Sequence, residues 1–158
     1  MTKFAVFLEL ADALNRQLGV VPLLYGSLGL EQRLGQDLHA DDIDILLPEI
    51  WLHEQWHGLE SLMRHMGYVL YDPHEHAFSG DGICVAFAGL ESLAPFAGIE
   101  IEKIPMLRYN DICYLLLDLE DYRKVYTASS FDGYRKDKKN KDDSAKLLLI
   151  ERAQGKSF

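Results

Sequence analysis

The chain has 158 residues, the usual length of one folded domain, and we expect a single domain over residues 1–158. Its composition, 48% hydrophobic and 26% charged, excludes the disordered and fibrous classes. The formal net charge of -9 argues against a protein that tracks nucleic-acid phosphates, so nucleic acid is not the expected partner.

Cysteine usage and hydropathy point to a cytoplasmic protein. Cys84 and Cys113 lie in apolar runs without metal-ligand spacing, and we expect reduced thiols. The N-terminal stretch lacks the cleavage site of a signal peptide. No apolar run reaches the roughly 20 residues that cross a bilayer, so no membrane partner is expected.

The first half of the chain alternates predicted helices and strands, with glycines at the helix ends. The expected elements are a helix over 3–18 closed by Gly19, a strand ending at Gly26, a brief helix stopped by Gly35, a strand over 41–48 and a helix over 49–66.

The second half has the same mixed order. Strands are expected over 68–72, 83–90, 99–105 and 111–119, a turn over 79–82, and helices over 119–129 and 141–153 with Leu147, Leu148 and Ile150 facing inward. Interleaved strands and helices indicate an α+β (mixed α/β) fold.

Two aspartates stand in an otherwise apolar strand. Asp42 and Asp44 are two residues apart, so in a strand both project to one side. Paired carboxylates repel each other unless a cation neutralises them. Mg²⁺ or Mn²⁺ is the simplest neutraliser, because these ions take carboxylate oxygens and keep positions for water and phosphates.

Gly26 and Ser27 supply a complementary part upstream. Gly26 has no side chain to block a phosphate, and Ser27 adds a hydroxyl at the start of the brief helix, where free N–H groups attract anions. A strand, Gly-Ser, a helix and a strand with Asp-x-Asp can together hold a nucleoside triphosphate and its metal.

The stretches "YGS" and "DIDI" resemble the signature of the DNA polymerase β-like nucleotidyltransferase superfamily, and within it the small lincosamide and aminoglycoside nucleotidyltransferases. The resemblance implies a mixed sheet packed on one face by helices. It also implies that Gly26 and Ser27 hold the phosphates of an NTP, most simply ATP, and that Asp42 and Asp44 bind the metal.

That family places a further carboxylate on a neighbouring strand, as a metal ligand or as the base that deprotonates the attacking hydroxyl. The stretch "ICVAFAGLESL" contains no aspartate. Glu91 is the nearest candidate, with Glu100 and Glu102 behind it. If no carboxylate reaches the site, the alternative is an inactive relative that binds nucleotide or a partner without turnover.

A rival motif, "HEQWH", matches the H-E-x-x-H pattern of zinc peptidases. On one helix, His53 and His57 would share a face and bind zinc while Glu54 activates water. No downstream residue is an evident third ligand.

The preferred function is therefore Mg²⁺-dependent transfer of a nucleoside monophosphate from an NTP to a hydroxyl. The acceptor is expected to be a small molecule or a protein side chain, because an acidic surface disfavours tRNA and DNA. Lys138 and Lys141 are cations that could reach the triphosphate. A homodimer or a partner protein remains open.

Overall fold

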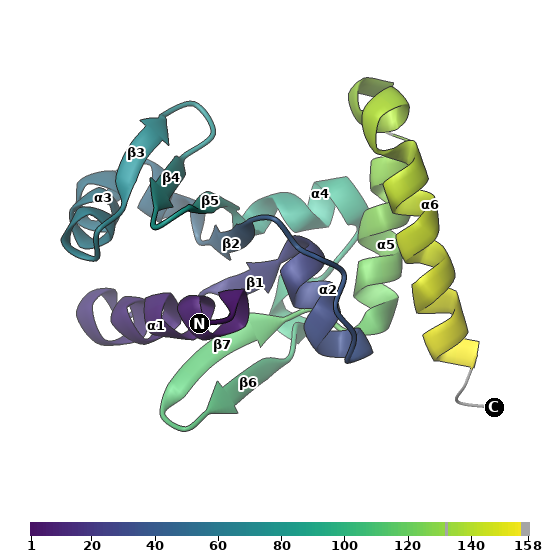
Figure 1. Cartoon of the computed structure of the whole chain (residues 1–158), viewed down its shortest axis with the longest axis horizontal. Coiled ribbons are helices and arrows are strands. Elements are labelled where there is room, and N and C mark those ends of the chain that lie inside the picture. The colour runs from purple at the N-terminus through teal and green to yellow at the C-terminus, as the bar shows by residue number, and fades with distance from the viewer. Residues whose placement is uncertain (132, 156–158) are drawn as a thin grey trace.

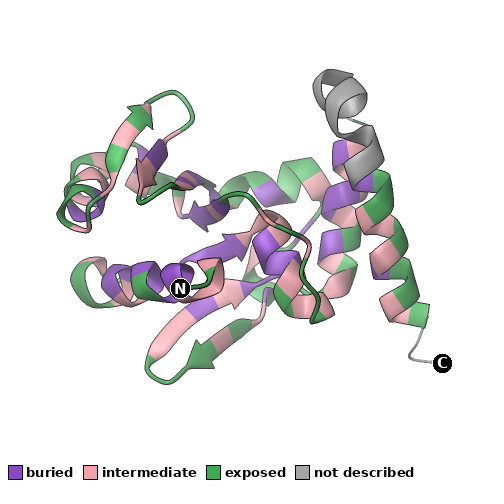
Figure 2. Ribbon diagram, viewed as in Figure 1, coloured by how far each residue is buried: buried purple, intermediate pink, exposed green. Residues whose placement is uncertain are grey.

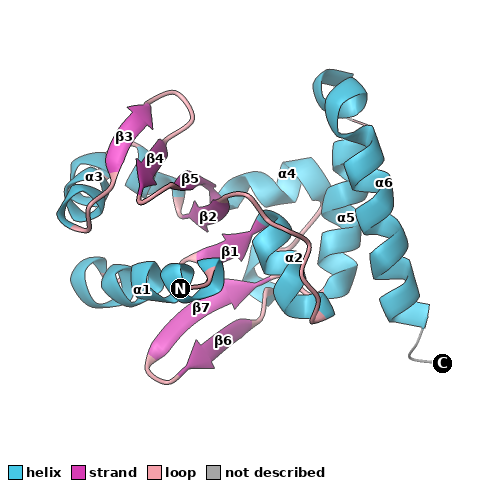
Figure 3. Ribbon diagram, in the orientation of Figure 1, coloured by secondary structure: helices cyan, strands magenta, loops and turns pink. Residues whose placement is uncertain are grey.

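The computed structural model describes the backbone of residues 1–131 and 133–155, and the side chains of 1–131 and 143–155. Its centre is a mixed sheet with the strand order β3-β4-β5-β2-β1-β7-β6 (Figure 3). The strands are β1 Leu23–Tyr25, β2 Ile43–Leu47, β3 Val69–Asp72, β4 Ala77–Gly80, β5 Ile83–Gly89, β6 Met106–Tyr109 and β7 Ile112–Leu116.

Helices precede, separate and follow these strands. They are α1 Lys3–Ala13, α2 Gly26–Leu34, α3 Trp56–His65, α4 Leu93–Ala97, α5 Leu119–Ser130 and α6 Gly133–Gly155. A π-helical turn over Leu14–Leu18 extends α1, and 3-10 turns span Glu49–Leu52, Leu90–Ser92 and Ile101–Lys103. Helices α5 and α6 lie side by side at one end of the molecule (Figure 1). None of the described helices is both long and apolar enough to cross a bilayer.

The central strands fix the geometry of the site. Strand β1 pairs antiparallel with β2, which places Tyr25 opposite Asp44. Strand β2 pairs in parallel with β5, so Ala86 lies beside Asp44 on its other flank. Because side chains alternate along a strand, Asp44 and Leu46 face one side of the sheet while Ile43, Ile45 and Leu47 face the other.

Helices α1 and α3 cover the face that carries Ile45. Rings of α1 contact Tyr114 of β7, with Phe7 5.5 Å from it between centroids. Trp56 of α3 packs on Phe78, which in turn contacts Phe87 beside Ile45. Buried positions accordingly gather in α1, β1, β2 and the facing side of α5 (Figure 2).

The connection between α2 and β2 is held by one carboxylate. Gly35 ends α2 in the left-handed region, as expected for a helix stop. Glu31 then accepts hydrogen bonds from the backbone N–H groups of Leu38 and Ala40, each 3.1 Å. This contact folds the connection back on α2, so the long interval between Ser27 and Asp42 still returns the chain to the edge of β1.

The structure corrects several predicted elements. The helix expected over 49–66 is interrupted, because a 3-10 turn and a further turn precede α3. The strand expected over 99–105 is wrong: this segment is irregular with one 3-10 turn, and it buries Ile99 and Ile104. Strands β4 and β6 were not predicted. Leu148 is 47% exposed rather than turned inward, whereas Ile150 is buried.

Candidate functional site

The backbone of Gly26 packs against the carboxylate of Asp44. Gly26 begins α2 with a φ of +65°, a left-handed conformation that favours glycine. A Cβ added at this position would lie 2.5 Å from Asp44 Oδ2. Glycine is therefore required by the approach of the carboxylate as well as by the turn, and the structure brings these two predicted site residues together.

Helix α5 supports this junction with two tyrosines. The buried Tyr122 hydroxyl lies 3.4 Å from the Leu24 carbonyl and 3.3 Å from that of Gly26, to which it donates. Tyr126 shares a side-chain hydrogen bond with Ser27. Burial, reinforced by neighbouring groups that include Asp44, raises the pKa of both phenols, so both stay protonated at neutral pH.

A cavity of about 390 Å³ opens beside these residues. It lies between the sheet face that carries Asp44 and helices α4, α5 and α6. Lysine 146 lies on its helical wall, with Nζ 5.2 Å from the centre of the Tyr126 ring. The lining includes Tyr25, Gly26, Ser27, Asp44, Leu46, Glu75, Ala86, Ala88, Phe96, Tyr122, Tyr126, Ser129 and Lys146.

Asp42 lies outside this cavity. It is exposed and precedes the first paired residue of β2, Ile43. The pKa of the Tyr71 phenol on β3 is raised, chiefly by a side-chain hydrogen bond with Cys84 and to a smaller extent by the charge of Asp42. Within the described part of the chain, no group of three or more His, Cys, Asp or Glu residues is arranged to hold a metal.

Glu91 is not brought to Asp44. It follows β5 and accepts hydrogen bonds from the backbone N–H of Glu49, at 3.0 and 3.3 Å. These residues lie beyond the Leu47 end of β2, three residues past Asp44, or about 10 Å along a strand. The residue of β5 directly beside Asp44 is Ala86, so the neighbouring strand offers a methyl group there.

The other acidic candidates also lie elsewhere. Glu100 forms an ion pair with Lys103 at 3.1 Å, and Glu102 is exposed in the adjoining 3-10 turn. Neither residue lines the cavity. The side chains of Lys138 and Lys141 lie outside the described residues.

The H-E-x-x-H geometry is not formed. His53 lies in a turn with φ -126° and ψ -95°, and α3 begins only at Trp56. His53 and His57 therefore do not stand one turn apart on a single helix, and both are exposed together with Glu54. The expectation of a shared helix face is wrong, and with it the zinc-peptidase hypothesis loses its structural basis.

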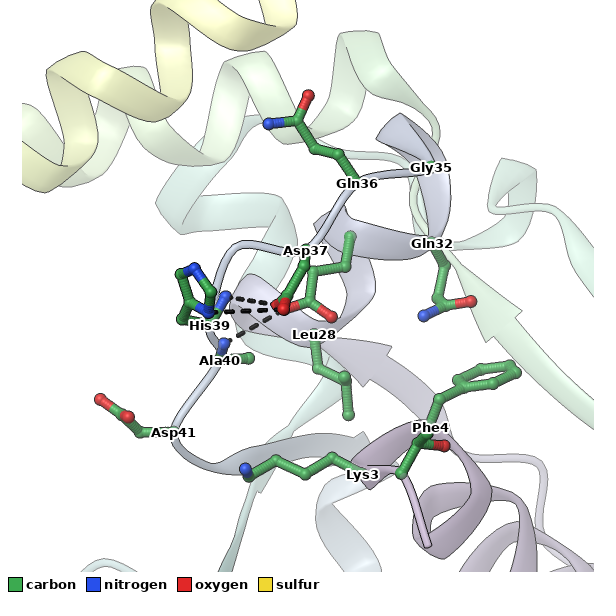
Figure 4. Close-up of a pocket in the computed structure, with 12 residues that line it drawn as sticks. Lys3, Phe4, Leu28, Gln32, Gly35, Gln36, Asp37, His39, Ala40 and Asp41 are labelled. Atoms are coloured by element: carbon green, nitrogen blue, oxygen red, sulfur yellow. Dashed lines mark hydrogen bonds and ion pairs between the residues drawn. The ribbon is translucent and has the colours of Figure 1, made fainter.

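A larger cavity, of about 720 Å³, lies between the start of α1, α2 and the α2–β2 connection (Figure 4). Its lining mixes Lys3, Gln32, Gln36 and Asp41 with apolar atoms but includes none of Gly26, Ser27 or Asp44. The interactions drawn there lie within the α2–β2 connection or join it to α2, as where the His39 N–H donates to Asp37 Oδ1 at 2.7 Å and the Ala40 N–H donates to Glu31. The smaller cavity is therefore the candidate site.

Comparison with known proteins agrees with this fold. No family model matches the chain. It is 38% identical over 152 residues to the uncharacterized protein YnaI of Bacillus subtilis (strain 168), covering 96% of this chain and 97% of YnaI. The chain belongs to the YnaI family.

Solved structures that are similar to this member of the YnaI family include ANT(2″)-Ia and a nucleotidyltransferase-like protein. The crystal structure of ANT(2″)-Ia in complex with adenylyl-2″-tobramycin is 13% identical with a TM-score of 0.59, covering 99% of this chain and 92% of that one. An antigenic nucleotidyltransferase-like protein from Paracoccidioides brasiliensis is 14% identical with a TM-score of 0.62, covering 92% and 73%. The predicted nucleotidyltransferase fold is confirmed.

The donor set of this YnaI-family site fits a hard divalent cation. Magnesium is commonly held by one or two carboxylates while water and phosphate oxygens complete its shell. Asp44 offers one such carboxylate at the cavity surface. Sequence reasoning missed two further charged residues of the lining, Glu75 and Lys146, because only the tertiary fold brings a hairpin turn and the last helix to this cavity.

Proposed function

We propose that the cavity binds a nucleoside triphosphate with Mg²⁺ or Mn²⁺, most simply ATP with Mg²⁺, and that the chain transfers the nucleoside monophosphate to a hydroxyl. The observation that supports this proposal best is the Gly26–Asp44 contact at the start of α2, inside a cavity that also carries Lys146. The cavity thus contains both a carboxylate that could bind the metal, Asp44, and a cationic side chain that could bind phosphate, Lys146.

Each group has a role that follows from its chemistry. Asp44 would hold the divalent cation, whose charge would neutralise the phosphates during transfer. Ser27, at the first turn of α2, would donate to a phosphate oxygen, and Lys146 would balance the charge of the leaving pyrophosphate. Asp42, exposed two residues before Asp44, would supply a second carboxylate to the metal.

The acceptor is proposed to be a hydroxyl of a small molecule or of a protein side chain. The net charge of -9 disfavours an extended nucleic-acid acceptor. The crystal structure of ANT(2″)-Ia contains adenylyl-2″-tobramycin, an adenylylated compound, and this supports the proposal of hydroxyl adenylylation here.

A second candidate is a nucleotide-binding module that does not turn its ligand over. The observation that favours it is Ala86, whose methyl group occupies the position on β5 beside Asp44. If no other group deprotonates an acceptor, nucleotide would bind and remain intact.

Both candidate functions require that the protein binds an NTP. Calorimetric titration with the four common NTPs and Mg²⁺ tests this requirement. We expect at least one NTP to bind, and Asp44→Asn to weaken that binding at least tenfold. Asp41→Asn is the matched control, because it removes the same charge from an exposed residue three positions away that does not line this cavity. Absence of binding by the wild-type protein would overturn both candidates.

Pyrophosphate release then separates the two candidates. An enzyme should release pyrophosphate from the bound NTP with water or with one member of a panel of hydroxyl compounds. A binding module should return the NTP intact. Measurement of the nucleoside monophosphate in the same samples shows which bond was broken.

A further inference from the structure

We propose that Glu75 is the base that takes the proton from the acceptor hydroxyl. This assignment rests on the proposed nucleotidyl transfer and names the residue that would make the site active. Glu75 belongs to the turn over 73–76 between β3 and β4, far in sequence from Gly26 and Asp44.

The sheet register carries this turn to the cavity. Ala77, which begins β4, pairs with Ala86 of β5, and Ala86 also pairs with Asp44. The N–H of Phe87 donates to the His76 carbonyl at 3.2 Å, which extends the contact with β5 toward the turn. Glu75 and Asp44 therefore approach the same stretch of β5 from opposite flanks, and both line the cavity.

The turn itself is held in place. The backbone N–H of Glu75 donates to Asp72 Oδ1 at 3.3 Å. His76 adopts a φ of +51° and packs its ring against Trp56, with 5.0 Å between centroids. These contacts fix the backbone on both sides of Glu75 while its own side chain remains exposed.

The small residues of β5 leave room between the two carboxylates. Ala86 and Ala88 form the part of the lining that β5 contributes beside Phe87. A methyl group fills little of the space above a sheet, so the longer Glu75 side chain can extend over β5 toward the metal side of the cavity. An acceptor hydroxyl could then lie between Glu75 and the α-phosphate.

The other lining groups are poor proton acceptors. Tyr122 and Tyr126 carry their protons at neutral pH, because burial raises the pKa of each phenol. The other polar side chains of the lining include the serine hydroxyls and the Lys146 amine, and neither of these groups is a carboxylate. Asp44 is the proposed metal ligand, which leaves Glu75 as the carboxylate able to accept a proton among the described lining residues.

The proposed step balances in atoms and charge. The acceptor hydroxyl gives its proton to the Glu75 carboxylate as its oxygen forms a bond to the α-phosphorus. The bond between the α-phosphorus and the bridging oxygen of the β-phosphate breaks, and pyrophosphate leaves with that electron pair. Solvent later removes the proton from Glu75, which is exposed.

The experiment compares Glu75→Gln with the wild-type protein, using ATP and Mg²⁺ with water and the hydroxyl panel as acceptors. Glu75→Gln should bind ATP within about twofold of wild type but form AMP or adenylylated product at least about 100-fold more slowly, the usual contribution of a positioned base. The acid limb of the pH–rate profile should flatten. Asp81→Asn, in the exposed turn at the other end of β4, is the charge-matched control.

A second part of the experiment tests whether another carboxylate restores the rate lost in Glu75→Gln. Ala86→Asp places a carboxylate on β5 beside Asp44, so the double variant Glu75→Gln/Ala86→Asp should recover at least about tenfold of the lost rate. Circular dichroism verifies that each variant is folded.

The possible outcomes distinguish a failure of the Glu75 assignment from a failure of the proposed nucleotidyl transfer. An unchanged rate in Glu75→Gln overturns the assignment of Glu75. Wild-type protein that binds ATP but forms no monophosphate or adenylylated product also overturns it, and leaves the binding module standing. Wild-type protein that binds no NTP overturns the proposed function itself.

Discussion

The Cα of Gly26 lies against the carboxylate of Asp44 so closely that any side chain at position 26 would displace it. This contact joins two adjacent strands: Tyr25, just before Gly26, is paired with Asp44 across β1 and β2. The turn that begins α2 and the proposed metal ligand therefore cannot move independently of each other.

Replacement of Gly26 by alanine should reveal this coupling. Gly35→Ala is a matched control, because Gly35 has a similar φ of +68° but nothing within 4 Å of an added Cβ. We expect Gly35→Ala to lower the free energy of unfolding by about 1 kcal/mol through backbone strain alone. Gly26→Ala should lose at least about 1 kcal/mol more and weaken NTP binding at least tenfold.

Urea denaturation and calorimetry measure these two effects on the same samples. Equal losses of stability in the two variants, with NTP affinity preserved in Gly26→Ala, would show that Asp44 adapts to the added methyl group without consequence.

Ser129 and Asp143 form a buried contact between α5 and α6. The Ser129 hydroxyl donates to Asp143 Oδ2 at 2.9 Å, and the Asp143 side chain is only 1% exposed. Ser129→Ala should lower the free energy of unfolding by about 1.5–3 kcal/mol, because a buried carboxylate loses a donor. In contrast, Ser130→Ala removes a local bond to the Thr127 carbonyl and should cost less than about 1 kcal/mol.

Chemical denaturation of both serine variants tests this expectation. A Ser130→Ala loss as large as that of Ser129→Ala would mean that the α5–α6 contact contributes little to stability.

Glu120 makes a pH-dependent contribution to the free energy of unfolding. Hydrogen bonds from Arg123, the main cause, lower its pKa from 4.5 to about 2. A lowered pKa in the folded state adds stability above pH 4.5, and this addition is lost as the pH falls toward 2. Because the pair is largely exposed, we expect Glu120→Gln to cost well under about 1 kcal/mol at neutral pH.

Thermal unfolding of wild type and Glu120→Gln between pH 2 and 7 provides the measurement. The difference in Tm should narrow between about pH 4.5 and 2 and should shrink in high salt. A difference that stays constant across this range would contradict the assignment to the Glu120–Arg123 pair.

The elements next to the site could be predicted because their signals are local. Apolar runs bounded by Gly26 and Pro48 indicated β1 and β2, and Gly19 and Gly35 marked helix ends that the structure places at positive φ. The motif predicted Gly26 and Asp44 as residues of one site, and the structure brings these two residues into contact. Helix periodicity over 49–66 concealed a break at His53, since the periodicity of apolar residues does not require continuous backbone hydrogen bonding.

Elements that form only through pairing with distant strands were harder to predict from the sequence. Strand β6 is four residues long and lies at the edge of the sheet, with Met106 and Tyr109 more than half exposed, so its own sequence shows little pattern. Glu75 and Lys146 were missed for a related reason. Their place in the lining of the cavity that contains Asp44 depends on the hairpin register and on the docking of α6, neither of which a local motif encodes.

The position of β1 in the sheet has one more consequence. With β2 on one side and β7 on the other, the strand that leads into Gly26 is hydrogen-bonded along both edges. Backbone amides there should exchange with solvent only when the whole sheet opens, whereas amides of the exposed turn over 73–76, which lie outside the strands, should exchange faster. A ligand that contacts both β1 and this turn would have little effect on the slow amide exchange of β1. Its binding should therefore be detected mainly as slower amide exchange in the turn.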